Sequence, residues 1–152
     1  MPSSILENSF LLNLVFPDEA VLDNLFVASN DYVVVTSKRL VLFNDNVPID
    51  SKEFMDFKYI NKDKNKLYLL MDEGVMVLDF KLNILEKKPF DTQGLEKIYV
   101  CDNKIILYGK NSYCEYKKEG MGNIERTKEN IIDVKSKGED VYIIFENDVK
   151  KI

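Results

Sequence analysis

Four acidic residues recur at one position of an internal repeat, and they are the residues best placed for chemistry. Asp23, Asp56, Glu96 and Asp133 each follow an apolar residue and open a short apolar or alternating segment. Four carboxylates at one end of a narrow channel would repel one another, raising some of their pKa values or recruiting a cation such as Ca²⁺. The simpler interpretation is that they face solvent or accept turn hydrogen bonds. We assign no metal or cofactor to them.

The sequence lacks the residues and motifs of the common catalytic sites. The chain has no His, so no imidazole can activate a Ser or Cys nucleophile or ligate a metal. Ser112 and Cys114 fall inside a predicted strand, where they act as packing residues. Gly120–Gly122 is a turn rather than a phosphate-binding loop, and the acidic pair Asp72–Glu73 is a solvent-facing turn. We predict that the protein is not an enzyme and assign no catalytic residues.

The repeat itself predicts the fold. In each of four copies an apolar run ends in a short polar turn, and a second apolar stretch follows. The first runs end at Thr36, Met71, Tyr108 and Phe145, which lie 35, 37 and 37 positions apart. A period of this length is typical of stacked or circular repeat folds, because one unit cannot bury its own apolar face. Each unit contains four short strands, and in three of them Asn plus a β-branched residue follows the hairpin (Asn46-Val47, Asn83-Ile84, Asn123-Ile124).

Burial patterns identify the kind of repeat. The second strand of each unit is apolar on both faces, as in Val33–Val35 and Ile105–Leu107, which predicts small sheets stacked face to face. The fourth strands, Ile84–Lys88 and Ile124–Lys128, are heavily charged, as exposed edge strands are. Buried middle strands with a charged outer strand describe the blade of a β-propeller.

The ends of the chain set the expected number of blades. The fourth unit stops at Ile152 on its third strand, whereas Leu11–Phe16 near the N-terminus is a spare apolar strand. We predict one all-β domain over residues 1–152, a small β-propeller of four blades of about four antiparallel strands, closed by the N-terminal strand. The repeats are approximately 17–50, 51–88, 89–128 and 129–152 plus 8–16. A helix within residues 4–26 is the alternative for the N-terminal region, and pairing of two copies into a larger ring is the alternative to closure.

The pattern over residues 10–152 resembles the β-propeller repeat proteins. It is similar in length and strand order to tryptophan–aspartate repeats, although the Gly-His and Trp-Asp signatures are missing because the chain has neither His nor Trp. The acid at the start of each innermost strand also resembles hemopexin-like propellers, without their aromatic signatures and terminal disulfide. The resemblance is to an architecture, so no functional residues carry over from it.

The composition of the chain limits the classes of binding partner and the cellular compartment that we expect. The net charge is −5 despite clusters such as Lys87-Lys88, and only two arginines are present, so we expect no direct sequence-specific binding to nucleic acid. No apolar stretch is long enough to span a membrane, and the first ten residues lack the basic start of a signal peptide. Cys101 and Cys114 fall on the first and third strands of one blade, too far apart for a disulfide. Free thiols favour a reducing, intracellular compartment.

A binding module is the function that remains. We predict a non-catalytic protein–protein interaction module, a small subunit or accessory factor that docks on a larger intracellular assembly. Phe90 and Met121, in loops expected at Lys88–Gly94 and Lys117–Gly122, are candidate apolar anchors for the partner, and ordinary blade packing is their alternative role. The alternative function is a propeller that binds an ion or small ligand in its central channel through the four acids.

Overall fold

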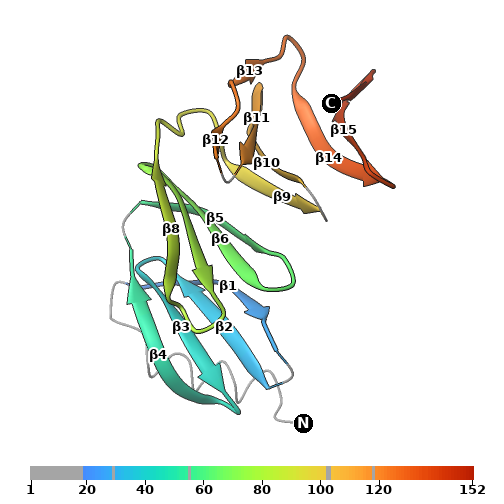
Figure 1. The fold of residues 1–152 in the computed structure, drawn as a ribbon. Coiled ribbons are helices and arrows are strands. Elements are labelled where there is room, and N and C mark those ends of the chain that lie inside the picture. The colour runs from blue at the N-terminus through green and yellow to red at the C-terminus, as the bar shows by residue number, and fades with distance from the viewer. Residues whose placement is uncertain (1–18, 29, 55, 102–103, 118) are drawn as a thin grey trace. The chain divides into compact units, whose positions relative to one another are not determined.

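The computed structural model describes residues 19–152 except for residues 29, 55, 102–103 and 118. The prediction of an all-β fold is confirmed: these residues form antiparallel strands arranged in four sheets of consecutive strands, which we call blades 1 to 4 (Figure 1). The range in which a helix was the alternative, residues 4–26, holds strand β1 (Val21–Phe26) in its described part. A helix suited to crossing a membrane is not found among the described residues.

The chain divides into two compact units. The first comprises the described part of Met1–Phe57 together with Phe80–Asn83, and the second comprises Lys58–Asp79 and Ile84–Ile152. Blade 1 belongs to the first unit, and blades 3 and 4, with most of blade 2, belong to the second. The assignment of the whole chain to one domain stays a prediction.

Blade 1 shows the burial pattern that the repeat predicts. Its strands follow the chain in the order β1 (Val21–Phe26), β2 (Asp31–Thr36), β3 (Arg39–Asn44) and β4 (Val47–Glu53). Consecutive residues of β2 and β3 are buried, whereas β4 is almost entirely exposed. Asp45 and Asn46 both have a positive φ, which gives the tight turn that joins β3 to β4.

Blade 2 has the same topology, with strands β5 (Phe57–Lys62), β6 (Lys66–Met71), β7 (Gly74–Asp79) and β8 (Ile84–Pro89). Gly74, after the turn between β6 and β7, pairs with Pro89 of β8. A Cβ atom at residue 74 would lie 2.1 Å from the Lys88 carbonyl oxygen, so only glycine allows β8 to approach this closely. The one clear glycine of the four hairpins therefore positions the outer strand.

Blade 3 departs from the prediction at its outer edge. Strands β9 (Lys97–Cys101), β10 (Lys104–Tyr108) and β11 (Ser112–Lys117) follow the expected order. The outer strand expected at Ile124–Lys128 is present but shorter, as β13 (Glu125–Arg126), and a second short strand, β12 (Gly120–Met121), pairs with the opposite end of β11. Gly122 donates its N–H to the Glu115 carbonyl, and residues 123–124 between the two strands pair with neither end of β11.

Blade 4 contains three strands among the described residues: β14 (Ile131–Lys137), β15 (Asp140–Phe145) and β16 (Val149–Lys151). No described strand pairs with the outer edge of β16. The strand predicted to close this blade, within residues 8–16, lies outside the described residues. Closure of the ring therefore stays a prediction.

Blades 2, 3 and 4 stack face to face, as the apolar middle strands predict. The blade 2–3 seam is a cluster of buried residues: Tyr68, Leu70, Val75, Val77, Leu95, Ile98, Leu107, Cys114 and Tyr116. The blade 3–4 seam is a second cluster: Ile106, Tyr113, Val134, Val141, Ile143 and Phe145.

The innermost strands of these blades are also joined by polar contacts that follow the repeat. Asn61 Nδ2 donates to the Ile98 carbonyl at 2.9 Å, and the hydroxyls of Tyr99 and Ser136 lie 2.7 Å apart. Each contact joins residues 37 positions apart, so the sequence period is also the spacing between neighbouring blades.

Candidate functional site

The four repeated acids do not share one environment. Asp23 and Asp56 belong to the first unit, and Glu96 and Asp133 belong to the second. Asp56 and Glu96 directly precede β5 and β9, as predicted, but Asp23 and Asp133 lie inside β1 and β14. In both strands the register shifts just before the acid, between Val21 and Asp23 and between Ile131 and Asp133. An extra residue in the strand therefore moves these acids inward from its start.

Local hydrogen bonds account for two of the carboxylates. Asp23 Oδ1 accepts the N–H of Asn24, and Asp133 Oδ1 accepts the N–H of Val134, both at 2.8 Å. Asp133 also lies 3.6 Å from the Lys135 ammonium. Within the described ranges, no three His, Cys, Asp or Glu side chains gather closely enough to hold a metal ion. The channel role of the acids stays a prediction.

Glu96 lies on the wall of a polar cavity of about 500 Å³ in blade 3. Asp91, Lys110 and Arg126 also line this cavity, so both signs of charge are present. Glu96 is exposed, and its backbone N–H pairs with the Tyr108 carbonyl. Such an open, mixed-charge cavity offers weak electrostatic selection for a cation or an anion.

The two apolar anchor candidates are less exposed than expected. Phe90 and Met121 are half-buried, and both pack against the blade 2–3 seam. Met121 lies in β12 rather than in a loop. Blade packing thus occupies part of each side chain, and their role in binding a partner stays a prediction.

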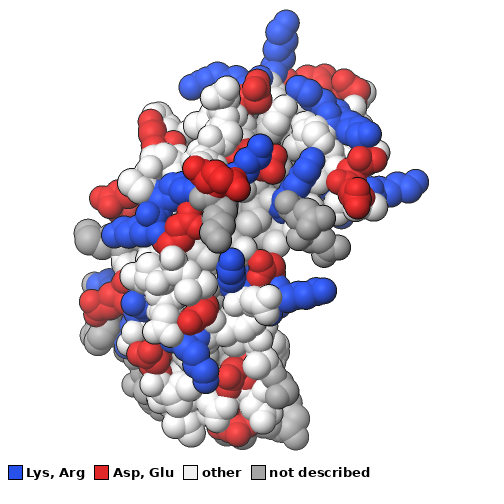
Figure 2. All heavy atoms as spheres, in the orientation of Figure 1, with Lys and Arg blue, Asp and Glu red and all other residues white. Residues whose placement is uncertain are grey.

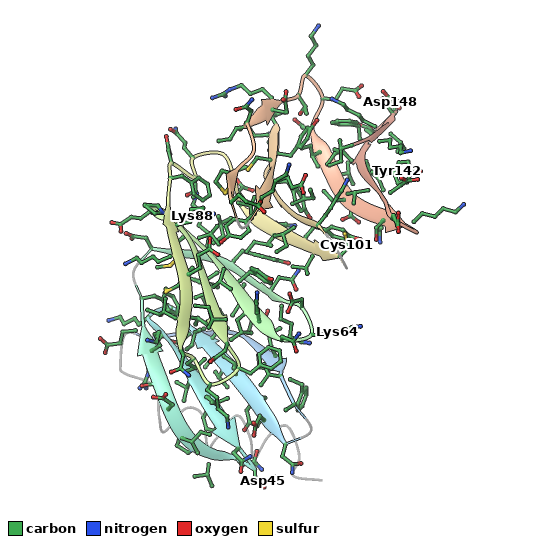
Figure 3. All side chains as sticks on the ribbon, in the orientation of Figure 1. Asp45, Lys64, Lys88, Cys101, Tyr142 and Asp148 are labelled. Atoms are coloured by element: carbon green, nitrogen blue, oxygen red, sulfur yellow. The ribbon has the colours of Figure 1, made fainter. Side chains whose placement is uncertain are left out.

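A larger cavity, which the sequence did not reveal, opens between blades 2 and 3. Its volume is about 550 Å³, and we call it the blade 2–3 groove. Strands and turns of both blades supply its walls, and in Figure 3 Cys101, at the end of β9, lies on the blade 3 side. The lining residues are Asp63, Lys66, Tyr68, Val77, Leu85, Glu86, Cys101, Lys104, Ile105, Glu115, Tyr116, Lys117 and Glu119.

Two tyrosines form the inner part of this groove. The rings of Tyr68, on β6, and Tyr116, on β11, meet edge to face with centroids 6.4 Å apart. The Tyr68 hydroxyl donates to Asp63 Oδ2 at 2.7 Å. Burial raises the pKa of the Tyr68 phenol above its usual range, and the Asp63 carboxylate adds to this effect. Burial alone would raise the pKa of Asp63, but hydrogen bonds from Asn65, Tyr68 and Lys66 lower it.

Tyr116 has a different environment. Lys88, on β8, places its ammonium 5.0 Å from the centroid of the Tyr116 ring, and the same ammonium lies 2.9 Å from Glu86 Oε1. Burial, followed by the nearby Glu86 carboxylate, raises the pKa of Tyr116 above its usual range. The Tyr116 hydroxyl is buried and faces the Glu86 carboxylate, with which it interacts.

The mouth of the groove combines apolar and charged groups. Leu85 is 52% exposed, and its neighbour Ile84 is 50% exposed. Within the described part of the chain, no ion pair engages the side chains of Glu115, Lys117 or Glu119. On the face shown in Figure 2, basic and acidic side chains are intermixed. The groove therefore offers apolar contact and charges of both signs.

Sequence reasoning missed this site because no local signal marks it. Tyr68 and Tyr116 look like ordinary strand residues, and Leu85 and Glu86 look like part of a charged outer strand. The groove exists only where two successive blades of the repeat pack together.

Comparisons with known proteins locate the fold but no family. No protein-family model matches the sequence, and no curated protein sequence is significantly similar to it. Among solved structures, the chain is similar to Kluyveromyces lactis Hsv2, with a TM-score of 0.58 and 13% identity over 88% of this chain and 46% of that one. It is similar to the Neurospora crassa Pan2 WD40 domain, with a TM-score of 0.62 and 12% identity over 86% of this chain and 48% of that one.

A third similar structure is the computationally designed protein Ika4, with a TM-score of 0.62 and 11% identity over 90% of this chain and 92% of that one. The chain thus spans about half the length of Hsv2 and of the Pan2 domain but nearly all of Ika4. At these identities the likeness shows the fold alone. The chain has a β-propeller-like, WD40-like architecture, as its repeat predicted.

Proposed function

We propose that this protein is a non-catalytic protein–protein interaction module that docks on a larger intracellular assembly. Propellers of the WD40 type often serve as interaction modules, because stacked sheets hold their loops and edges rigidly. The blade 2–3 groove is the observation that carries the proposal. It places the exposed Leu85 beside charges of both signs and a buried hydroxyl, a combination found in the core and rim of protein interfaces.

The ionisable groups of the groove support a binding role over a catalytic one. The raised pKa values of Tyr68 and Tyr116 keep both phenols protonated at neutral pH, so neither is a base. In the buried seam beside the groove, burial raises the pKa of the Cys114 thiol to about 11, which keeps it in the unreactive protonated form. Both cysteines are free, in keeping with a reducing compartment.

Affinity purification of the tagged protein from its native cell tests this proposal. Under gentle lysis we expect it to be recovered in near-stoichiometric amounts with at least one other protein, in a complex heavier than the chain's 17.7 kDa. Recovery as a lone monomer would count against docking on an assembly. The proposal also predicts that the purified protein, incubated with candidate metabolites, turns over none of them.

A further inference from the structure

The polar cavity that Glu96 lines, which we call the blade 3 cavity, lies over a row of residues that crosses the blade. Ser112, at the start of β11, pairs directly with Arg126 of β13. Gly109 donates its N–H to the Ser112 carbonyl, and Glu96 donates its N–H to the carbonyl of Tyr108, the residue before Gly109. Residues opposite one another on neighbouring strands share a face of the sheet, so the side chains of Glu96, Ser112 and Arg126 start from the same face of blade 3.

The hydroxyl of Ser112 is free in the wall of this cavity. Ser112 is 7% exposed, and its side chain makes no hydrogen bond with any described residue. The hydroxyl is not among the fully enclosed polar atoms of the described residues, and Ser112 lines the cavity, so an occupant can reach it. Buried polar groups of native proteins almost always have a partner. An unpaired hydroxyl here therefore points to a polar group on a molecule that enters the cavity.

The charges of the cavity are separated by sign. The acids Asp91 and Glu96 both belong to the segment between β8 and β9. The cations come from the other wall, Lys110 from the β10–β11 turn and Arg126 from β13. No ion pair within the described ranges engages any of the four. A lone anion or a lone cation is attracted by one wall and repelled by the other, whereas a ligand that carries both charges is attracted by both walls.

The geometry of the walls favours the end of a polypeptide over a free amino acid. The backbones of Glu96 and Arg126 are three strand spacings apart, which is about 14 Å. A free amino acid carries its ammonium and its carboxylate on one carbon, but a polypeptide that ends near a basic side chain can hold the two charges farther apart. The Gly94 carbonyl lies against Gly109, where a Cβ atom would clash with it, so no chain can pass between this segment and the sheet. A chain that enters from solvent must therefore end or turn back there.

We propose that the blade 3 cavity binds the C-terminal end of a partner polypeptide. The terminal carboxylate accepts hydrogen bonds from the Ser112 hydroxyl and from the charged groups of Lys110 and Arg126, because charge-assisted hydrogen bonds are the strongest that a carboxylate makes. A Lys or Arg side chain within the last few residues of the partner faces Asp91 and Glu96.

This site goes beyond the proposed function because it is separate from the blade 2–3 groove. The two lie at opposite ends of β10: Lys104, its first residue, lines the groove, and Lys110, in the turn after it, lines the blade 3 cavity. A protein with both sites can hold one partner at the groove and the C-terminus of the same or another partner at the cavity.

Selection of a library of random heptapeptides with free C-termini against the intact protein tests the inference. We expect the enriched peptides to share a Lys or Arg within their last four positions. Each enriched peptide is then synthesised with a C-terminal carboxylate and with a C-terminal amide, and both affinities are measured. The amide removes the terminal charge and its charge-assisted hydrogen bonds, so it should bind at least tenfold more weakly.

Three variants of the protein locate the binding site. Arg126→Gln should weaken binding of the carboxylate peptide about tenfold, and Ser112→Ala about threefold to tenfold. Glu96→Gln gives a test of sign. It should weaken binding if a basic side chain faces Glu96, whereas a ligand that brought only a carboxylate would bind this variant more tightly, because a repulsion is removed.

Two variants in the β14–β15 hairpin of blade 4 make the same changes of charge away from the cavity. Lys137→Gln and Glu139→Gln substitute exposed residues that do not line it, and neither should change the peptide affinity. Thermal melts establish that each variant is folded. Should Ser112→Ala fail to fold, Arg126→Gln, at an exposed residue, decides the outcome.

Four results would overturn the inference: no enriched peptide, equal binding of the carboxylate and amide forms, unchanged affinity in Arg126→Gln, or tighter binding by Glu96→Gln. None of them bears on docking through the blade 2–3 groove. The proposed function fails separately, through recovery of a lone monomer from the native cell.

Discussion

The two seams of the second unit are built from the same repeat but differ at their outer ends. At each seam a lysine lies over a tyrosine ring: Lys88 is 5.0 Å from the Tyr116 centroid, and Lys150 is 5.6 Å from the Tyr113 centroid. Near the inner strands both seams bury aliphatic side chains completely, as Leu107 and Ile143 show. The repeat therefore fixes the packing of the inner strands.

The cavities at the outer ends separate the two seams. The blade 2–3 groove has a volume of about 550 Å³, whereas the cavity that Tyr113 lines near the blade 3–4 seam has about 190 Å³. The tyrosine hydroxyls differ as well. The Tyr113 hydroxyl interacts with Lys150 and raises the pKa of its ammonium, whereas the Tyr116 hydroxyl faces the Glu86 carboxylate and has its own pKa raised, chiefly by burial. The two seams thus differ where the outer strands vary, on a scaffold that the inner strands keep constant.

The largest effect is expected from removing the N-terminal strand that is predicted to pair with the outer edge of blade 4. Blade 4 has three described strands, and residues 11–16 are predicted to supply the fourth. Deletion of residues 1–16 should expose the edge of β16 and cause the protein to unfold or oligomerise. Light scattering and thermal denaturation measure both effects. A truncated chain that stays monomeric with an unchanged melting temperature would show that the N-terminal strand does not close the fold.

Truncation of the inner packing should show that the two seams are equivalent there. Leu107, at the blade 2–3 seam, and Ile143, at the blade 3–4 seam, are both fully buried. Leu107→Ala and Ile143→Ala should each lower the free energy of unfolding by about 2–5 kcal/mol, through lost burial and a new cavity. Urea denaturation measures this loss. A loss at only one of the two positions would contradict a common inner core for blades 2 to 4.

Alkaline pH should weaken the blade 2–3 seam through three groups. Burial raises the pKa of Cys114 to about 11 and the pKa values of Tyr68 and Tyr116 above their usual range. The unfolded chain loses these protons first as the pH rises. The three groups therefore contribute their full stabilisation below about pH 9, and the free energy of unfolding falls as the pH rises beyond it. Thermal denaturation between pH 8 and pH 11 measures the decline. In Cys114→Ala the decline should begin about one pH unit higher, where tyrosines ionise, and an onset that does not move would mean that Cys114 is not buried as described.

Much of this fold could be predicted because its signals are local and repeated. The apolar runs at Val33–Val35 and Ile105–Leu107 predicted buried middle strands, and the exposed β4 and β8 follow the predicted outer strands. The predicted strand positions differ from the structure where a single residue alters the pairing between strands. The register shifts before Asp23 and Asp133, and the close approach of Gly122 to Glu115, depend on pairing partners that the local sequence does not specify.

The candidate site could not be predicted for a related reason. Its key residue, Tyr116, gains its properties from Glu86 and Lys88, which belong to another blade and lie about 30 positions earlier. Lys88 was predicted to lie on a charged, exposed outer strand, yet its ammonium donates to the Lys117 carbonyl and so joins the two outer regions. Only the packing of one blade on the next reveals such a contact.

The smallest effect concerns the two hydroxyls. Tyr116→Phe removes a buried hydroxyl that interacts with the Glu86 carboxylate and should lower the free energy of unfolding by about 1 kcal/mol. Tyr113→Phe removes the interaction with Lys150 and should lower the melting temperature slightly. Parallel thermal melts at pH 7 compare the variants. An unchanged or raised free energy of unfolding in Tyr116→Phe would show that the Tyr116 hydroxyl gains nothing from Glu86 in the folded protein.

The central claim is tested most directly by measuring how much partner protein co-purifies from the native cell with the wild type, with Leu85→Glu and with Ile49→Glu. The two substituted residues have similar exposure, 52% and 50%, and both lie on outer strands, but only Leu85 lines the groove. We predict that Leu85→Glu loses the partner while Ile49→Glu retains it, with both variants folded. Retention of the partner by Leu85→Glu, or equal loss by both variants, would contradict docking through the blade 2–3 groove.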